Sequence, residues 1–144
     1  MSPFPHRHSG SPRILVVDDE PGVRHSLQRL LEWEEYEVES AGSGEEALAV
    51  LRHAECDAIV CDLRMPGMSG QQLHARMRIE FPELAGRMIF TSGDLYDPAA
   101  QSFLEATGCP ALQKPYQTEA FLTLLARLTA PAAEPSTVEN RRAS

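Results

Sequence analysis

Residues 58–70 read A-I-V-C-D-L-R-M-P-G-M-S-G and combine a strand signal with a turn signal. It opens with a short, fully apolar run, which is typical of a strand buried on both faces of a parallel sheet. Asp62 ends the run, and the segment from residue 64 to residue 70 is dense in turn-forming residues. The stretch therefore predicts a buried strand that brings one carboxylate to the edge of a sheet.

Further apolar runs, and an alternating apolar and polar pattern at residues 36–41, give strand signals along the chain, and these are interspersed with helical spacing of apolar residues. Strands are expected at residues 14–17, 36–41, 58–61, 88–90 and 111–113. Helices are expected over about residues 21–34, onward from Ser43 in a capping box with Glu46, around Leu73 and Met77 up to about Pro82, over about 98–107, and from the cap Thr118 to Leu128. Five strands and five helices in strict alternation predict an α/β fold with a parallel sheet and helices on both faces.

The composition indicates one acidic domain. The chain has 144 residues, a formal net charge of −8 and a pI near 5.1. This balance argues against direct nucleic-acid binding, which requires a basic face. No apolar run approaches the roughly 18 residues of a membrane helix, and residues 1–12 lack the apolar region of a secretory signal. We expect a cytoplasmic protein without membrane contact, with its domain at residues 13–129 and disordered tails at 1–12 and 130–144.

Hydrophilic side chains stand at the carboxyl ends of four predicted strands. They are Asp18 with Asp19, Asp62, Thr91 and Lys114. Ligands of open α/β sheets bind beyond the carboxyl ends of the strands, so these side chains are expected to converge although they lie far apart in the sequence. A single shared site accounts for all of them together.

The chemistry of this set favours a divalent cation and a phosphoryl group. Two like charges about 4 Å apart repel by about 4 kcal/mol at an effective dielectric of about 20, so neighbouring carboxylates need a compensating cation. Carboxylate-rich sites with open positions suit Mg²⁺. The cation and Lys114 would neutralise phosphoryl oxygens, Thr91 would donate a hydrogen bond, and an aspartate would be the nucleophile.

Four strings, in this order, carry a resemblance to a known family. They are I-L-V-V-D-D-E at residues 14–20, C-D-L-R-M-P-G-M-S-G at 61–70, I-F-T-S-G at 89–93 and K-P at 114–115. Together they resemble the receiver domain of bacterial response regulators over about residues 13–128. The resemblance implies a flavodoxin-like, doubly wound sheet of order 2-1-3-4-5. It also implies a cis peptide bond within the K-P pair.

The resemblance further implies a role for each site residue. Asp62 is then the phosphoacceptor, Thr91 the switch hydroxyl, and Lys114 the lysine that contacts the phosphoryl group. The implied ligands of Mg²⁺ or Mn²⁺ are Asp18, Asp19, Asp62 and the backbone carbonyl of Arg64.

The implied partners are a histidine kinase or histidine phosphotransfer protein, and an effector protein that reads the changed surface. The chain is expected to be a signalling phosphoacceptor that catalyses only its own phosphorylation and dephosphorylation, and no enzyme otherwise. Because no output domain fits after Leu128, it is expected to be a stand-alone receiver. A relay intermediate and a receiver cut from a hybrid kinase stay open.

One position departs from the family pattern. Receivers commonly carry an aromatic residue or histidine three residues before the lysine, where this chain has Ala111. Output is therefore expected to depend on the loop and helix after Thr91. Two other functions stay open. One is a degenerate receiver that binds partners without phosphorylation. The other is a phosphohydrolase of the haloacid dehalogenase type, which Arg64 disfavours because that family has a second aspartate at this position.

Overall fold

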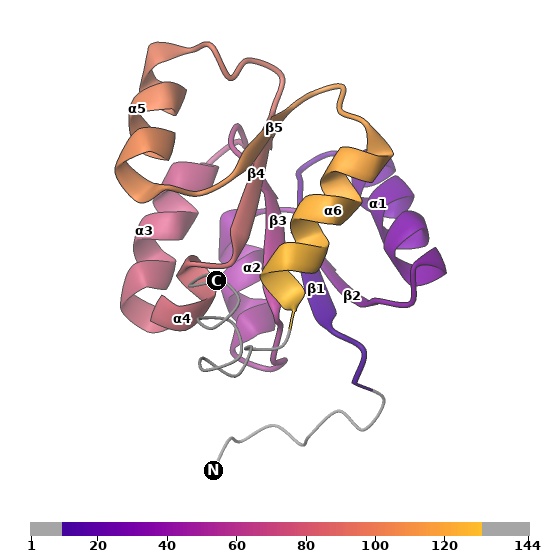
Figure 1. The fold of residues 1–144 in the computed structure, drawn as a ribbon. Helices are drawn as coiled ribbons and strands as arrows, with labels where there is room; N and C mark the ends of the chain where they lie inside the picture. The colour runs from indigo at the N-terminus through magenta and orange to yellow at the C-terminus, as the bar shows by residue number, and fades with distance from the viewer. Residues whose placement is uncertain (1–9, 131–144) are drawn as a thin grey trace, which may run out of the picture.

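The computed structural model describes residues 10–130 (Figure 1). The tails predicted at residues 1–12 and 130–144 lie outside these residues, apart from residues 10–12 and 130. Within the described part, strands and helices alternate along the chain from one end to the other.

One parallel sheet of five strands forms the centre, in the order β2-β1-β3-β4-β5. The strands are β1 (Arg13–Val17), β2 (Glu37–Ala41), β3 (Ala58–Asp62), β4 (Met88–Ser92) and β5 (Ala111–Gln113). All five strands run upward in Figure 1, so their carboxyl ends lie together at the top. The predicted fold class and strand order are confirmed.

Six helices cover the sheet within residues 10–130, one more than the sequence predicts. They are α1 (Pro21–Trp33), α2 (Gly44–Leu51), α3 (Gly70–Glu80), α4 (Pro82–Ala85), α5 (Pro98–Thr107) and α6 (Thr118–Thr129). The additional helix is the single turn of α4. Pro82 marks the end of α3, as predicted, but it also occupies the first turn of this new helix, where its missing N–H costs nothing.

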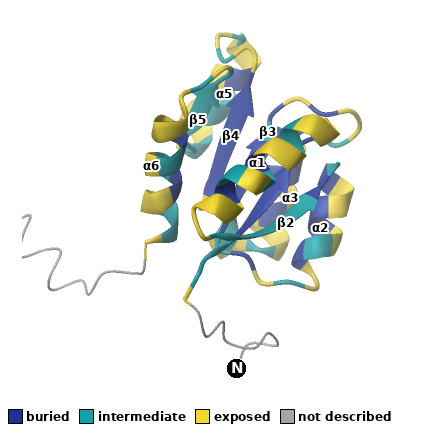
Figure 2. Cartoon of the chain, turned by 90° about the vertical axis from the view of Figure 1, so that its right-hand side faces the viewer, coloured by how far each residue is buried: buried dark blue, intermediate teal, exposed yellow. Residues whose placement is uncertain are grey.

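The helices divide into two layers, each with its own apolar core. Helices α1 and α6 cover one face of the sheet, where Leu31 and Phe121 are fully buried against strand residues. Helices α2 to α5 cover the other face, where Leu73 and Met77 are fully buried. Figure 2 shows the resulting pattern, with the central strands β1, β3 and β4 buried, the edge strands β2 and β5 of intermediate burial, and helices that are exposed on their outer sides. This two-layer cover explains why the central strands are apolar without alternation.

Local capping agrees with the sequence in part. The Ser43 hydroxyl accepts a hydrogen bond from the Glu46 amide, as predicted, while the Glu46 carboxylate accepts from the amide of Gly42 and not of Ser43. The predicted cap at Thr118 is wrong, because Thr118 is already the first residue of α6 and no side chain caps that helix. No helix within residues 10–130 is long and apolar enough to cross a membrane.

Candidate functional site

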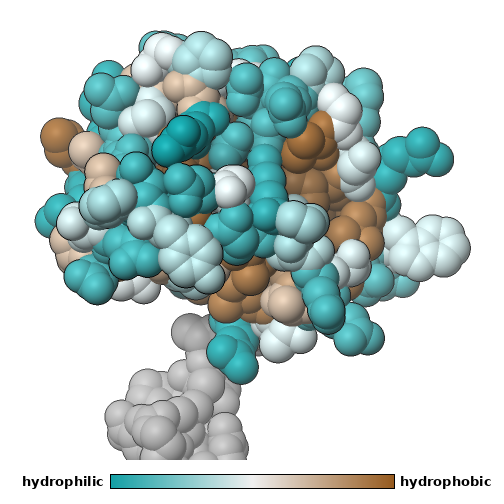
Figure 3. All heavy atoms as spheres, turned by 90° about the horizontal axis from the view of Figure 1, so that it is seen from above, coloured by the Kyte–Doolittle hydropathy of each residue, from teal (hydrophilic) through white to brown (hydrophobic). Residues whose placement is uncertain are grey.

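The predicted site residues meet at the carboxyl end of the sheet. Asp18 directly follows β1, Asp62 ends β3, Thr91 lies near the end of β4, and Lys114 directly follows β5. Figure 3 looks onto this end of the molecule, whose surface is mainly hydrophilic with an apolar area to one side. The convergence that the sequence predicts is therefore present in the structure.

Three carboxylates form the acidic part of the site. Asp18, Asp19 and Asp62 each offer an oxygen, and these oxygens lie within 4.8 Å of one another. The side chain of Asp18 is only 3% exposed and that of Asp62 12% exposed, so water screens their repulsion poorly. Three hard oxygen ligands at one edge, open to solvent beside Asp19, suit a cation such as Mg²⁺.

Lys114 is the cation that reaches this acidic cluster. Its Nζ lies 3.3 Å from Oδ2 of Asp18 and 3.6 Å from Oδ2 of Asp62. Burial raises the pKa of Asp62 above its ordinary value, and the nearby Lys114 only partly opposes this shift. Burial alone would lower the pKa of Lys114, but the charges of Asp62 and Asp18 outweigh it and raise the pKa. One lysine thus leaves the cluster with excess negative charge, which a divalent cation would neutralise.

The buried Asp18 is held by the backbone and side chains around it. Its amide donates to the carbonyl of Ala41, and its Oδ1 accepts a hydrogen bond from the amide of Glu20. The guanidinium of Arg24 donates to the Asp18 carbonyl at 2.7 Å. No sequence signal distinguishes Arg24 from the other arginines of the predicted helices.

The phosphoacceptor candidate is held in place from two sides. Asp62 pairs with Thr91 across β3 and β4, so the side chains of both residues emerge on the same side of the sheet. Thr91 is buried, as expected for a residue on a central strand of the sheet. On the other side, a Cβ at Gly70 would lie 2.7 Å from the Asp62 carbonyl oxygen. Only glycine therefore allows α3 to begin so close to Asp62.

Arg64 lies at the edge of the site. Its amide nitrogen lies 3.5 Å from Oδ1 of Asp62, at the limit of hydrogen bonding. Its side chain points away from the carboxylates and reaches Asp97 at 3.8 Å. The predicted role of its backbone carbonyl as a metal ligand stays a prediction.

Residues 14–126 match the family model of the response regulator receiver domain. The chain belongs to the response regulator receiver family. Receivers act in two-component signalling, in which histidine kinases are their partners, and they bind Mg²⁺ at an acidic pocket of the kind formed here by the three aspartates.

Individual relatives include mycobacterial response regulators. It is 37% identical to the response regulator MprA of Mycobacterium bovis over 83% of the chain and 50% of the relative. It is 32% identical to the probable transcriptional regulatory protein TcrX of Mycobacterium tuberculosis over 78% of the chain and 48% of the relative. The receiver thus spans about half the length of these curated relatives.

Solved structures agree with this assignment. The chemotaxis protein CheY4 of Vibrio cholerae superposes with a TM-score of 0.73 at 29% identity, covering 82% of the receiver and 98% of CheY4. The response regulator TrrA of Thermotoga maritima, solved in complex with Mg²⁺-BeF, superposes with a TM-score of 0.71 at 28% identity, covering 81% and 98% of the two chains.

Ala111 occupies the position where the family commonly has an aromatic residue, and its neighbour on β4 is a large side chain. It pairs in register with Phe90 on β4. The ring of Phe90 packs edge-on against Phe103 of α5, with centroids 5.2 Å apart, and His74 of α3 contacts both rings. The aromatic ring of Phe90 on β4 therefore lies beside the small Ala111 on β5. Position 111 itself carries only a methyl group.

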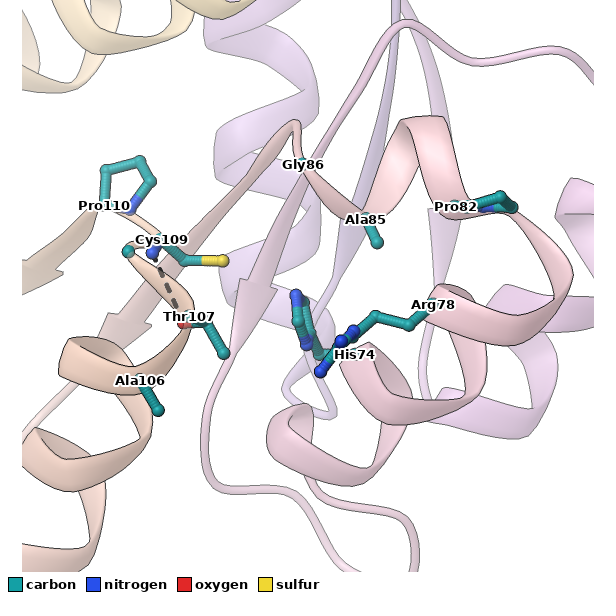
Figure 4. Close-up of a pocket in the computed structure, with 10 residues that line it drawn as sticks. His74, Arg78, Pro82, Ala85, Gly86, Ala106, Thr107, Cys109 and Pro110 are labelled. Carbon is teal, nitrogen blue, oxygen red and sulfur yellow. Dashed lines mark hydrogen bonds between the residues drawn. The ribbon is translucent and has the colours of Figure 1, made fainter.

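The opposite end of the sheet holds a cavity of about 320 Å³. In Figure 4, His74 and Arg78 on α3 face Thr107 and Cys109 across it. Burial, aided by the charge of Arg78, lowers the pKa of His74. No carboxylate is among the residues that line this cavity, so it lacks the acidic chemistry of the carboxyl end.

Proposed function

We propose that Asp62 accepts a phosphoryl group from a phosphohistidine on a partner kinase or phosphotransfer protein. The observation that carries this proposal is the position of Lys114, which lies within 3.6 Å of both Asp18 and Asp62. A nucleophilic carboxylate is placed beside a cation that can follow the charge onto an incoming phosphoryl group. The relation to TrrA, which was solved with Mg²⁺-BeF, supports the same chemistry.

The residues that would hold the metal are Asp18, Asp19, Asp62 and the backbone carbonyl of Arg64, with Mg²⁺ or Mn²⁺ as the ion. When bound, this ion would neutralise charge on the phosphoryl oxygens. The three carboxylate oxygens within 4.8 Å of one another fit a hard divalent cation that keeps some of its water ligands.

The reaction is a transfer from nitrogen to oxygen. A carboxylate oxygen of Asp62 forms a bond to phosphorus, while the bond between phosphorus and the histidine nitrogen breaks and its electron pair stays on the imidazole. The imidazole then takes a proton from solvent. Lys114 exchanges one carboxylate partner for a phosphoryl oxygen. Thr91 lies on the same side of the sheet as Asp62, and its hydroxyl donates a hydrogen bond to a second phosphoryl oxygen.

In this proposal the receiver catalyses only its own phosphorylation and dephosphorylation. The result of phosphorylation is an altered protein surface. The acidic cluster gains charge, and the groups that contact it must rearrange. We propose that an effector protein binds this altered surface. Slow hydrolysis of the acyl phosphate by water returns the receiver to its initial state.

A phosphotransfer assay tests the proposal. The receiver is incubated with Mg²⁺ and with purified kinases whose histidine carries a labelled phosphoryl group. We expect label on the wild type and on the control Glu105→Gln, which removes an exposed acid on α5, and none on Asp62→Asn. Absence of label on the wild type with every kinase and with small phosphodonors would instead support a degenerate receiver. Continuous turnover of phosphate esters would support a phosphohydrolase.

A further inference from the structure

The loop between β4 and α5, residues 93–97, is fastened to β5 by one side chain. Nε2 of Gln113 donates to the carbonyl of Gly93 at 2.6 Å, and Oε1 accepts from the amide of Leu95 at 2.8 Å. These two partners fix the orientation of the amide, because one requires a donor and the other an acceptor. The loop begins two residues after Thr91 in the chain and leads into α5 (Figure 1).

The side-chain amide of Gln113 replaces a backbone group that the strand lacks beyond Lys114. The β4–β5 ladder continues to the bond from the Lys114 amide to the Ser92 carbonyl at 2.7 Å. Pro115 comes next and has no N–H to donate. The side-chain amide of Gln113 presents N–H donors and a carbonyl acceptor in one plane, as a peptide group presents its N–H and C=O, and so extends the pairing into the loop.

The other bonds of the loop are local or exposed. The amide of Asp94 donates to Oγ of Ser92, two residues earlier at the end of β4, and the amide of Tyr96 donates to Oδ1 of Asp94 within the loop, so both bonds join near neighbours in the chain. The ion pair of Arg64 with Asp97 spans 3.8 Å between side chains that are 69% and 35% exposed, a kind of contact that contributes little. Gln113 therefore supplies the main polar attachment of the loop to the sheet among the described residues.

Gln113 is also adjacent in the chain to Lys114, whose Nζ contacts Asp18 and Asp62. We propose that Gln113 is a positioning residue that holds the loop 93–97 in the unphosphorylated arrangement and transmits a change at Lys114 to α5. This inference rests on the proposed function. Displacement of Lys114 toward a phosphoryl group shifts the end of β5, which changes the fit of the Gln113 amide to Gly93 and Leu95. The loop is then released, although Ala111 offers no aromatic side chain to move.

The test compares Gln113→Met, which keeps the length of the side chain but loses its hydrogen bonds to Gly93, Leu95 and the Lys114 carbonyl, with Gln113→Glu, which keeps the acceptor alone. Gln101→Met, on the exposed side of α5, is the matched control. In the absence of phosphodonor, we expect amide exchange at Leu95 to be about tenfold faster in Gln113→Met. We expect a smaller increase in Gln113→Glu and none in the control.

A second measurement separates coupling from mere packing. Contacts that favour the unphosphorylated state oppose binding to the phosphorylated one, so removing them must raise affinity for a phosphoryl mimic. With Mg²⁺ and beryllofluoride, Gln113→Met is expected to bind the mimic several times more tightly than the wild type, with a smaller exchange difference in α5 between the free and bound states. A purely structural role for Gln113 would leave this affinity unchanged or lower it.

The results distinguish this inference from the proposed function. A wild-type receiver that takes up neither phosphate nor beryllofluoride would overturn both. A wild type that takes them up, beside a Gln113→Met variant with wild-type loop exchange or unchanged affinity, would overturn only the role of Gln113.

Discussion

The two ends of the sheet each bury a titratable side chain, but they bury it in different surroundings. At the carboxyl end, Asp18 and Asp62 are brought together with Lys114 within 3.6 Å of both. At the amino end, His74 lies edge-on to two phenylalanine rings beside a cavity whose only other ionisable lining groups are Arg78 and Cys109. Opposite charges converge at one end, whereas at the other burial lowers the pKa of a histidine.

Under the proposed function, this difference assigns the chemistry to the carboxyl end and a structural role to the amino end. The repulsion among the carboxylates is a cost that the fold bears until a cation binds. The histidine and its aromatic neighbours bear no such cost and join α3, β4 and α5 into one core. Substitutions at the two ends should therefore change different properties of the receiver.

The largest expected effect concerns metal binding at the carboxyl end. Asp18→Asn removes the charge of a buried ligand, so affinity for Mg²⁺ should fall at least about tenfold. Titration calorimetry with Mg²⁺ measures it directly. His74→Phe, at the amino end, is the matched control and should keep the wild-type affinity. Equal losses in the two variants would break the division between the ends.

The next effect concerns stability at the amino end. Met77 is fully buried on α3 near His74, and Met77→Ala should lower the free energy of unfolding by about 3 kcal/mol because it leaves a cavity. Urea unfolding monitored by circular dichroism measures this loss. Under conditions where the variant is folded, its phosphorylation should stay at the wild-type level. A strong loss of phosphorylation without a loss of stability would contradict the division.

The smallest effect is a pH dependence of opposite sign at the two ends. Burial raises the pKa of Asp62, so the folded state holds that proton more tightly than the unfolded state does. Without Mg²⁺, the free energy of unfolding should fall as the pH rises from about 4, the ordinary aspartate value, through the raised pKa. Asp62→Asn should be more stable than the wild type above this window and lose that advantage below it.

His74 should behave in the reverse way. Its pKa is lowered, so stability is complete above the ordinary histidine value of about 6.5 and falls as the pH decreases from there through the lowered pKa. His74→Phe should remove this part of the pH dependence. Thermal unfolding across the pH range tests both residues, and a slope that persists in both variants would assign the titration to other groups.

Much of the fold was predictable because burial on both faces of the sheet leaves a plain signal in the sequence. Fully apolar runs such as residues 14–17 and 58–61 admit little other than central parallel strands. The short α4 was missed because Pro82 both follows one helix and begins another. The capping box of Ser69 with Gln72 at the start of α3 was missed as well, although its spacing could have indicated it.

The candidate site was predictable because its residues stand at strand ends, and the topology alone brings such ends together. The residues that hold them in place were not. Arg24 reaches the carbonyl of Asp18 and Gln113 reaches the loop after Thr91. Such contacts depend on where loops lie in space, and an arginine or glutamine on the surface looks the same in sequence with or without them.

The most direct test of phosphorylation at Asp62 is mass spectrometry of the receiver after incubation with acetyl phosphate and Mg²⁺. We predict an adduct of about 80 Da that hydroxylamine removes, as it does an acyl phosphate. Peptide mapping should place it on the segment that contains Asp62, and it should be absent from Asp62→Asn. An adduct on the segment that contains Asp18 and Asp19, or an adduct that persists in Asp62→Asn, would contradict the account.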